Sequence, residues 1–246
     1  MAASTSQLLN LEGSNLLGTL NMVFGSPKSS PKLLSKAFRK RKKTTEDVPN
    51  RNGEREKLCL QDRHVTCRLH RDDLKTYVQL PKGVEENEWI ATHTIKLYDN
   101  LQLITNCLTE YCTAENCPVM SGGQNLIFYW VSERNKKMRP TAPTYIEMVM
   151  SWTEKQIKDE LVFPTKYGNQ FPPTFKDTVR KMFRFFFHII AHIYYSHFQD
   201  VINFELVPHL NTLFHHYVLF SQEFNLVEDK EMAPLETLIN LLIGTN

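Results

Sequence analysis

The sequence predicts an all-α fold, in which five or so amphipathic helices form a bundle with short connections and one small β-hairpin. Three observations predict it. Apolar residues recur at helical intervals from Ile90 to Tyr111 and again from Val179 to Tyr194. One short segment, Leu126–Val131, is rich in β-forming residues. No internal repeat is visible, so the helices belong to a bundle rather than to a repeat array.

Length and composition limit the class of protein. The 246 residues suffice for one full-sized domain with a tail, or for two small domains. Hydrophobic residues at 41% and a net charge of +2 are ordinary for a soluble globular protein and do not indicate a polyanion binder. The odd count of 5 cysteines and the lack of a signal-peptide pattern predict a reducing cytoplasm or nucleus. No apolar run approaches the roughly 18 residues of a membrane span.

Residues 1–70 are predicted to be a disordered or weakly ordered tail, and residues 71–246 the helical domain. The tail is poor in apolar residues and rich in Ser, Pro and Lys, so it cannot repay the entropy cost of ordering. Its basic run, Lys36–Lys43, is a solvated tail or, less favoured, a nuclear-import or nucleic-acid patch. Ser26 and Ser30, each followed by proline, are candidate phosphorylation sites.

The domain is expected to begin with an extended segment, because Leu74–Leu80 alternates apolar and polar residues. Pro81 and Gly83 then turn the chain. A helix starts near Glu85–Trp89 with acids in its first turn and continues to Cys112. After it the chain breaks at Ser121–Gly123.

The hairpin is predicted from Leu126–Val131, a turn at Ser132–Asn135 and a return strand at Lys136–Pro140. Thr141–Pro143 opens a helix that runs through Ile157, with proline near its first turn. A proline-rich connector, Phe163–Pro173, follows.

The second half of the domain is predicted to be helical throughout. Thr174 and Asp177 resemble a capping box before the long phenylalanine-rich helix. Two further helices are expected from about Pro208 to Phe224, with Asn225 as terminator, and from Asp229 to Ile243.

Two pairs of residues have the spacing of metal ligands. Four residues separate Cys112 from Cys117, and four separate His192 from His197. Two thiolates and two imidazoles complete a closed tetrahedral shell around zinc, which leaves no position for substrate or activated water. The pattern therefore predicts a structural zinc site, while Cys107 is expected to be a buried structural thiol.

The histidine spacing conflicts with an ideal helix, on which residues five apart point about 140° away from each other. His197 can join His192 only if it lies at a frayed or kinked helix end. Otherwise His192 is a core histidine and His197 a surface one, and His188, one turn earlier, is a rival ligand.

Catalytic motifs are missing from the sequence. It lacks the zinc-deaminase pattern, Gly-x-Ser-x-Gly, a phosphate-binding glycine loop and His-Glu-x-x-His. Glu85, Glu86 and Glu88 are best read as a charged helix start. A non-enzyme is therefore predicted; the alternatives are a zinc-dependent hydrolase with an open metal position and a nucleic-acid-binding module using the basic run.

A set of short segments resembles one known family over roughly residues 72–243. The segments occur in order: Leu80–Ala91, Glu110–Met120, Ala142–Tyr145, Phe163–Lys166, Ala191–Phe198, His209–Thr212, Glu223–Leu226 and Ala233–Leu235. Together they resemble the Mob family of kinase co-activators. Thr76–Pro81 and Phe163–Gly168 are similar to the branch that partners Ndr-type kinases.

The resemblance implies a four-helix-bundle core with a small hairpin and a structural zinc ion. Its metal ligands fall on Cys112, Cys117, His192 and His197. It also implies a non-catalytic adaptor in Hippo-type signalling, which binds the basic N-terminal regulatory segment of Ndr/Lats kinases of the AGC group. The acidic surface for that segment would include Glu85, Glu86 and Glu88 beside Trp89.

Two departures from the family change the expected partners. Some members bind phosphothreonine peptides through a Lys-Arg…Arg cluster, whose positions hold Arg184, Phe185 and His188 here. Because phosphate recognition depends on several charge-assisted bonds, we predict weak or absent binding of such phosphopeptides. Lys96 stands where some Lats-binding members carry an acid, which argues against a Lats partner.

Overall fold

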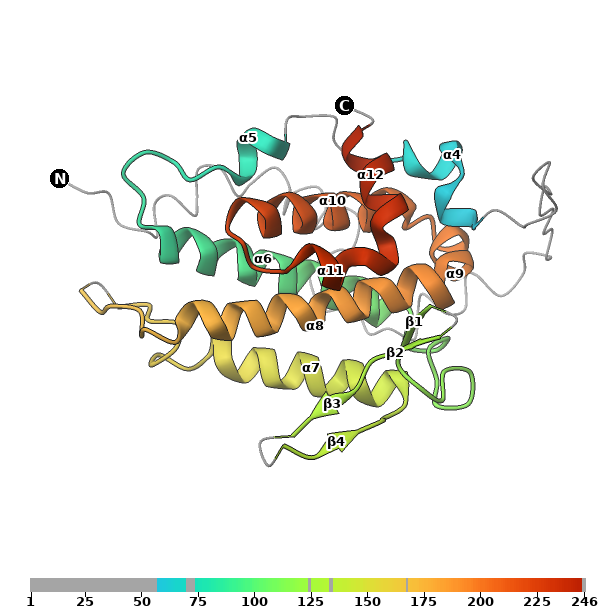
Figure 1. Cartoon of the computed structure of the whole chain (residues 1–246), viewed down its shortest axis with the longest axis horizontal. Coiled ribbons are helices and arrows are strands. Elements are labelled where there is room, and N and C mark those ends of the chain that lie inside the picture. The colour runs from blue at the N-terminus through green and yellow to red at the C-terminus, as the bar shows by residue number, and fades with distance from the viewer. Residues whose placement is uncertain (1–56, 70–73, 124, 133–134, 167, 245–246) are drawn as a thin grey trace, which may run out of the picture. The chain divides into compact units, whose positions relative to one another are not determined.

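The computed structural model describes residues 57–69, 74–123, 125–132, 135–166 and 168–244, all within the compact unit Pro49–Asn246 (Figure 1). Four long helices form its core: α6 (Glu86–Cys107), α7 (Ala142–Ile157), α8 (Phe175–Ser196) and α10 (Val207–Glu223). α6 contacts each of the other three. The described part of the chain is thus mostly helical, as predicted.

Helix α8 is the central element of the core. Its buried residues are mainly aromatic and aliphatic, and Phe183, Phe186 and Phe187 are almost fully shielded from solvent. Phe183 stacks on Tyr217 of α10 with ring centroids 5.4 Å apart, and the Tyr217 hydroxyl donates to the Phe183 carbonyl at 2.9 Å. Such large rings bury the most apolar area per residue, which makes α8 the surface on which the other helices pack.

The segment predicted to be extended is instead a short helix, α5 (Leu74–Val78). Leu74 and Val78 are four residues apart, so a helix places both on one face, and both are buried. α5 packs on α10 through that face. An alternating pattern over so few residues fits a strand as well as a helix. The contact with α10 determines which of the two forms.

The predicted start of α8 and the predicted end of α10 have different outcomes. Thr174 makes no capping hydrogen bond with its side chain, and Asp177 instead pairs with Arg180 at 3.0 Å, so the predicted capping box is wrong. Asn225 has a φ of 52°, and the Leu226 N–H donates to the Ser221 carbonyl, so the predicted terminator of α10 is confirmed.

The last predicted helix is divided into three pieces. They are α11 (Asp229–Met232), the 3-10 turn η3 (Ala233–Leu235) and α12 (Glu236–Gly244). Pro234 lies in the 3-10 turn, where its missing N–H cannot continue a regular helix. A further short helix, α9 (Phe198–Asn203), follows α8 directly.

The predicted hairpin is present but shorter, and a second ladder precedes it. β3 (Trp130–Val131) pairs antiparallel with β4 (Lys137–Met138). β1 (Ser121–Gly123), expected to be a chain break, pairs with β2 (Leu126–Ile127). Gly122 is needed there, because a Cβ atom would lie 2.6 Å from the Phe128 ring and 3.1 Å from the Ala191 Cβ of α8.

Residues 57–69 correct the predicted tail, since they belong to the packed domain. The 3-10 turn η2 (Leu58–Leu60) and α4 (Asp62–Val65) contact α12. Cys59 and Val65 are buried, and the Asn211 amide donates to the carbonyls of His64 and Cys67. The expectations for the basic run and for the two Ser-Pro sites lie outside the described residues.

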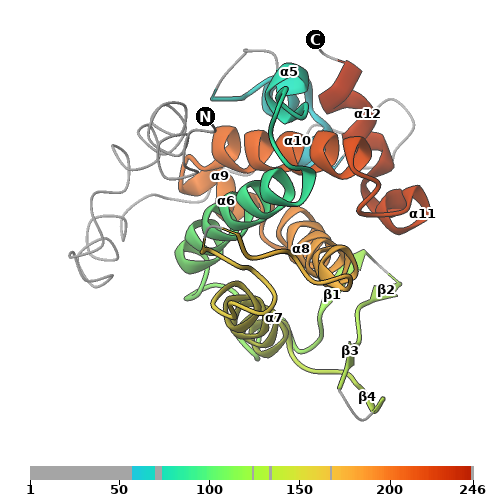
Figure 2. The ribbon, with the colours of Figure 1, turned by 90° about the vertical axis from the view of Figure 1, so that its left-hand side faces the viewer.

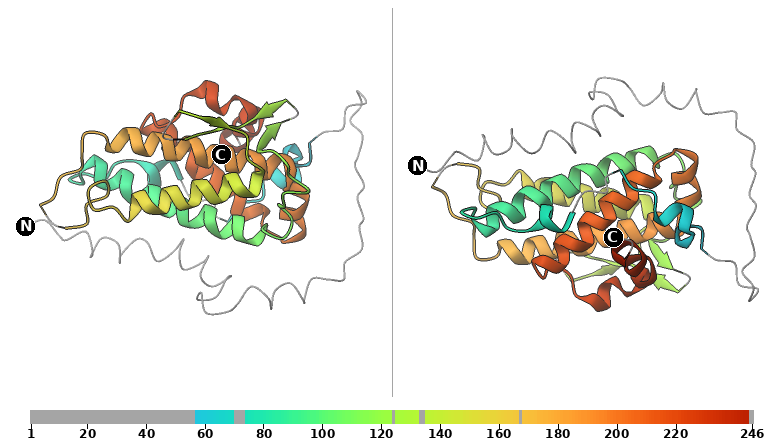
Figure 3. Two further views of the ribbon diagram at one scale, coloured as in Figure 1. Left: turned by 90° about the horizontal axis from the view of Figure 1, so that it is seen from below. Right: turned by 90° about the horizontal axis from the view of Figure 1, so that it is seen from above.

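None of the described helices is both long enough and apolar enough to cross a membrane. Seen from below and from above, α6, α7 and α8 run along one another, with the ladders at one side (Figure 3). The connectors between α5 and α6 and between α7 and α8 lie at the end of the bundle where α6 begins (Figures 2 and 3).

Candidate functional site

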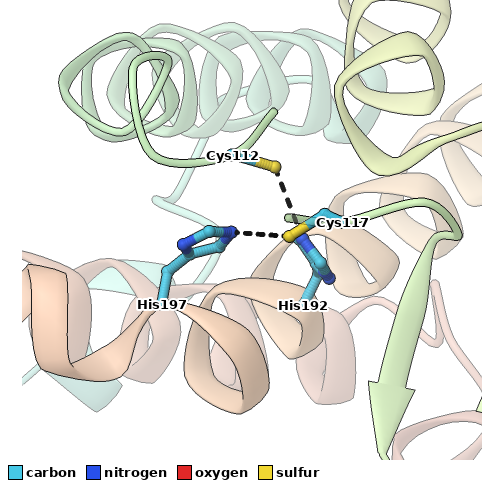
Figure 4. Close-up of side chains that lie close together, drawn as sticks. All are labelled: Cys112, Cys117, His192 and His197. Carbon is cyan, nitrogen blue, oxygen red and sulfur yellow. Dashed lines mark hydrogen bonds between the residues drawn. The ribbon is translucent and has the colours of Figure 1, made fainter. Parts of the chain in front are cut away.

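The two cysteines and two histidines predicted as ligands meet in one buried cluster (Figure 4). Their donor atoms all lie within 4.8 Å of one another. Cys112 Sγ is 3.5 Å from His192 Nε2, and Cys117 Sγ is 3.4 Å from His197 Nε2. Segments 80 residues apart in the chain are therefore brought to one point.

These distances fit a tetrahedral metal site. Bond lengths of about 2.3 Å to sulfur and 2.0–2.1 Å to nitrogen place the two atoms about 3.6 Å apart across a tetrahedral angle. The cysteines are free thiols rather than a disulfide. A hollow lined in part by Cys117, His192, His197 and Asp200 adjoins the cluster. The cluster could therefore hold a metal ion through four protein ligands.

The helix end resolves the conflict in histidine spacing. α8 ends at Ser196, and His197 lies outside its geometry, with φ −125° and ψ 11°. The His197 carbonyl then accepts from the Val201 N–H at the start of α9. Because the chain turns at this residue, the His197 ring faces the same point as His192, as the prediction of a kinked end requires.

The cysteines are positioned by the loop that follows α6. The Cys112 N–H donates to the Leu108 carbonyl, and the Cys117 N–H donates to the Thr113 carbonyl. The Cys117 carbonyl accepts from the Ala142 N–H at the start of α7. Backbone hydrogen bonds at Cys112 and at Cys117 thus hold the loop at both of its cysteines.

Each histidine is oriented by a hydrogen bond on its other ring nitrogen. His192 Nδ1 donates to the Ser121 carbonyl of β1 at 2.8 Å, and His197 Nδ1 donates to the Asp200 carboxylate at 3.1 Å. Both bonds leave Nε2 as the ligand atom, the arrangement that metal-binding histidines use. Neither Ser121 nor Asp200 was predicted as part of the site.

Burial disfavours the charged forms of three of the ligands, the thiols of Cys112 and Cys117 and the imidazole of His192. It raises the pKa of the Cys112 thiol to about 12 and lowers the pKa of His192 to about 4. A divalent ion reverses the preference of buried thiols, since a coordinating thiol is deprotonated. Neutral imidazole is already the form that binds metal.

His188 is not a ligand. Its Nδ1 shares a hydrogen bond with the Tyr145 hydroxyl at 2.6 Å, and its ring stacks on Phe128 with centroids 3.9 Å apart. Cys107 lies outside the cluster and is half-buried.

The acidic start of α6 has partly structural roles. The Glu85 carboxylate caps the helix by accepting from the Glu88 N–H at 3.0 Å. Glu86 forms an ion pair with Lys176 of α8. The pKa of Glu88 is raised by burial and by the neighbouring Glu85 carboxylate. The three predicted acids therefore do lie together, although Glu85 and Glu86 also hold the local structure.

Trp89 links α6 to α5. Its indole Nε1 donates to the Val78 carbonyl at 3.1 Å, and its ring lies 4.4 Å from that of His93. His93 in turn shares a 2.8 Å hydrogen bond with His216 of α10. Trp89 is half-buried and follows the acids in the chain.

The three positions that correspond to a phosphopeptide pocket are occupied by internal contacts. Arg184 pairs with Glu231 at 2.7 Å. Phe185 is buried, and it stacks on Trp130 at 5.1 Å and meets Trp152 edge-on at 5.6 Å. Burial lowers the pKa of His188 to about 3, so it carries no charge near neutral pH. An aromatic cluster thus occupies these positions, and its two tryptophans, Trp130 and Trp152, carried no signal in the sequence that linked them to Phe185.

The fold and the site together define the class of protein: a mostly helical bundle with a closed cluster of four side chains that could hold a structural metal ion. The family model described as the Mob1/phocein family matches residues 66–235, and the chain belongs to this family. MOB kinase activator 2 of Homo sapiens is 42% identical over 190 residues, which cover 77% of this chain and 80% of the human protein. MOB kinase activator 2 of Mus musculus is 40% identical over 193 residues, covering 78% and 82%. MOB kinase activator-like 1A of Arabidopsis thaliana is 40% identical over 184 residues, covering 74% and 86%.

Proposed function

We propose that this protein is a non-catalytic co-activator that binds the N-terminal regulatory segment of an Ndr-type protein kinase and modulates its activity. The observation that carries the proposal is the match to kinase activators across most of the helical domain. The co-activator would act in Hippo-type signalling, in the cytoplasm, the nucleus or both.

The metal in this proposal is zinc. Two thiolates and two imidazoles at tetrahedral spacing suit Zn²⁺, and a site with four protein ligands is structural. Bound zinc would cross-link the loop after α6 to the end of α8, while Ser121 and Asp200 keep the two imidazoles oriented. The zinc-hydrolase alternative is not favoured, because it needs a coordination position that these four side chains fill.

The acidic start of α6 is the proposed contact for the kinase segment. Glu85 is exposed, Glu88 is half-buried beside it, and the half-buried Trp89 follows. A basic helix would meet carboxylates and an aromatic surface here, and the charge complementarity would speed and orient docking. The aromatic replacement of the phosphopeptide pocket and Lys96, whose ammonium bonds the Tyr77 hydroxyl at 3.1 Å, support an Ndr-type rather than a phosphopeptide or Lats partner.

Titration calorimetry of the full chain with candidate kinase regulatory segments tests the proposal. The double variant Glu85→Asn with Glu88→Gln removes two charges while asparagine keeps a capping group, so the helix start should survive. We expect it to weaken binding about tenfold or more. Glu236→Gln, which removes one charge at an exposed acid of α12, is the control and should bind normally. Lack of binding by the unaltered protein to any such segment would refute the proposal.

A further inference from the structure

We propose that the docking surface has a second part, an apolar anchor formed by Leu161, and that its ligand is a basic amphipathic helix. The inference rests on the proposed function and specifies what the partner must present: cations for the start of α6 and an apolar residue for Leu161. It adds the turn 159–165 between α7 and α8 to the binding surface.

The side chain of Leu161 is exposed to solvent, whereas other residues of the same turn are buried. Its side chain is 81% exposed, the highest value among the large hydrophobic residues that the structure describes. Phe163 and Pro164 in the same turn are buried. Fully shielding a leucine is worth about 1.5–3 kcal/mol, so a partner that covers Leu161 gains affinity.

Hydrogen bonds hold this turn in one conformation. The Asp159 carboxylate accepts from the Leu161 N–H at 2.9 Å, and the Asp159 carbonyl accepts from the Phe163 N–H at 2.8 Å. The Glu160 carboxylate accepts from both the backbone N–H and the hydroxyl of Thr165. The leucine is therefore presented before a partner arrives, which lowers the entropy cost of binding.

The turn lies at the end of the bundle where α6 begins (Figure 2). Phe163 and Phe171 pack against Phe175, the first residue of α8, with centroids 5.2 and 4.4 Å away. The next residue, Lys176, forms the ion pair with Glu86. These contacts connect the leucine turn to the acidic helix start through two residues of α8.

Charge and shape select the kind of partner. Glu85 and Glu88 lie at the start of α6, and Asp159 and Glu160 lie on the turn, between the exposed Lys158 and Lys166. A purely apolar partner would desolvate these carboxylates without supplying a cation to them. A helix with lysines or arginines beside a leucine face satisfies both requirements at i, i+3 and i+4 spacing.

The test uses two synthetic peptides and the full chain in titration calorimetry. One peptide is a basic helix with leucines on one face, and the other has the same composition with the leucines dispersed. Leu161→Ser should weaken binding of the first peptide about tenfold to a hundredfold and leave the second unchanged. Val131→Ser, at a 48% exposed valine on β3, is the control and should change neither affinity.

The outcomes separate this inference from the proposed function. If Leu161→Ser leaves the affinity unchanged while Glu85→Asn with Glu88→Gln weakens it, the leucine anchor is wrong and the acidic docking site stands. If the unaltered protein binds neither the peptides nor a kinase segment, both fail. Concentration-dependent dimerisation abolished by Leu161→Ser would show that a second copy, not a basic helix, covers the leucine, and would overturn the inference.

Discussion

Removing one ligand of the metal cluster should cost the domain a large part of its stability. The ligands Cys112 and His192 are 80 residues apart, so a bound zinc ion closes a loop of that length. Treated as a cross-link of the unfolded chain, a loop of 80 residues corresponds to about 4.5 kcal/mol of unfolding free energy. For a domain of this size such a loss lowers the melting temperature by roughly 10–15 °C.

The perturbation is Cys112→Ala, and the assays are metal content by atomic absorption and unfolding by urea and by heat. We expect one zinc per chain in the unaltered protein and less than one in the variant. Chelator should lower the stability of the unaltered protein toward that of the variant and have little effect on the variant itself. Cys107→Ala, at a half-buried thiol outside the cluster, is the control and should keep both the metal and the response to chelator.

One result would refute this reasoning. If stripping the bound zinc leaves the unfolding midpoint unchanged, the metal does not cross-link the fold. A metal absorption edge fitted by fewer than two sulfurs and two nitrogens would refute the closed ligand set, whatever the stability.

Three other predictions concern the ladders, the histidines and the altered pocket. Gly122→Ala should lower the unfolding free energy by about 1–3 kcal/mol through overpacking, while Gly123→Ala, whose Cβ would lie 3.8 Å from its nearest neighbour, should be nearly neutral in urea unfolding. Burial lowers the pKa of His93 to about 2 and of His216 to about 3, so the unfolded chain binds more protons below pH 6.5. Stability should therefore fall as pH drops from 6.5 toward 4, by about 1.4 kcal/mol per pH unit for each histidine, and His93→Gln should flatten that slope in unfolding measured against pH. A phosphothreonine peptide should give no binding heat in calorimetry because Arg184 is paired with Glu231; a micromolar dissociation constant would contradict this.

Long elements were predictable because their patterns repeat many times. α8 spans 22 residues, enough for several turns of apolar spacing that no strand could produce. α5 was predicted wrongly because its 5 residues include only one such repeat. β1 was missed because Gly122 and Gly123 resemble a break, whereas close packing against α8 is the reason for glycine at Gly122.

The metal cluster was likewise predictable in part from the sequence. Ligand types and spacings were visible in the chain, but helix geometry alone argued against using His192 and His197 together. The turn at His197 removes that objection, and it depends on where α8 ends. Ser121 and Asp200 had no sequence signal, because a backbone carbonyl and a lone aspartate acquire their roles only by proximity.

By itself, the sequence determined the helical class, the two ligand pairs and the family resemblance, because periodicity, residue chemistry and spacing are local properties of a chain. Only the tertiary structure decided that the four ligands converge, that Arg184 is paired and Phe185 buried, and that Leu161 points to solvent at the end where α6 begins. Each of these depends on contacts between residues far apart in the chain. Such contacts arise from packing, which no short sequence pattern specifies.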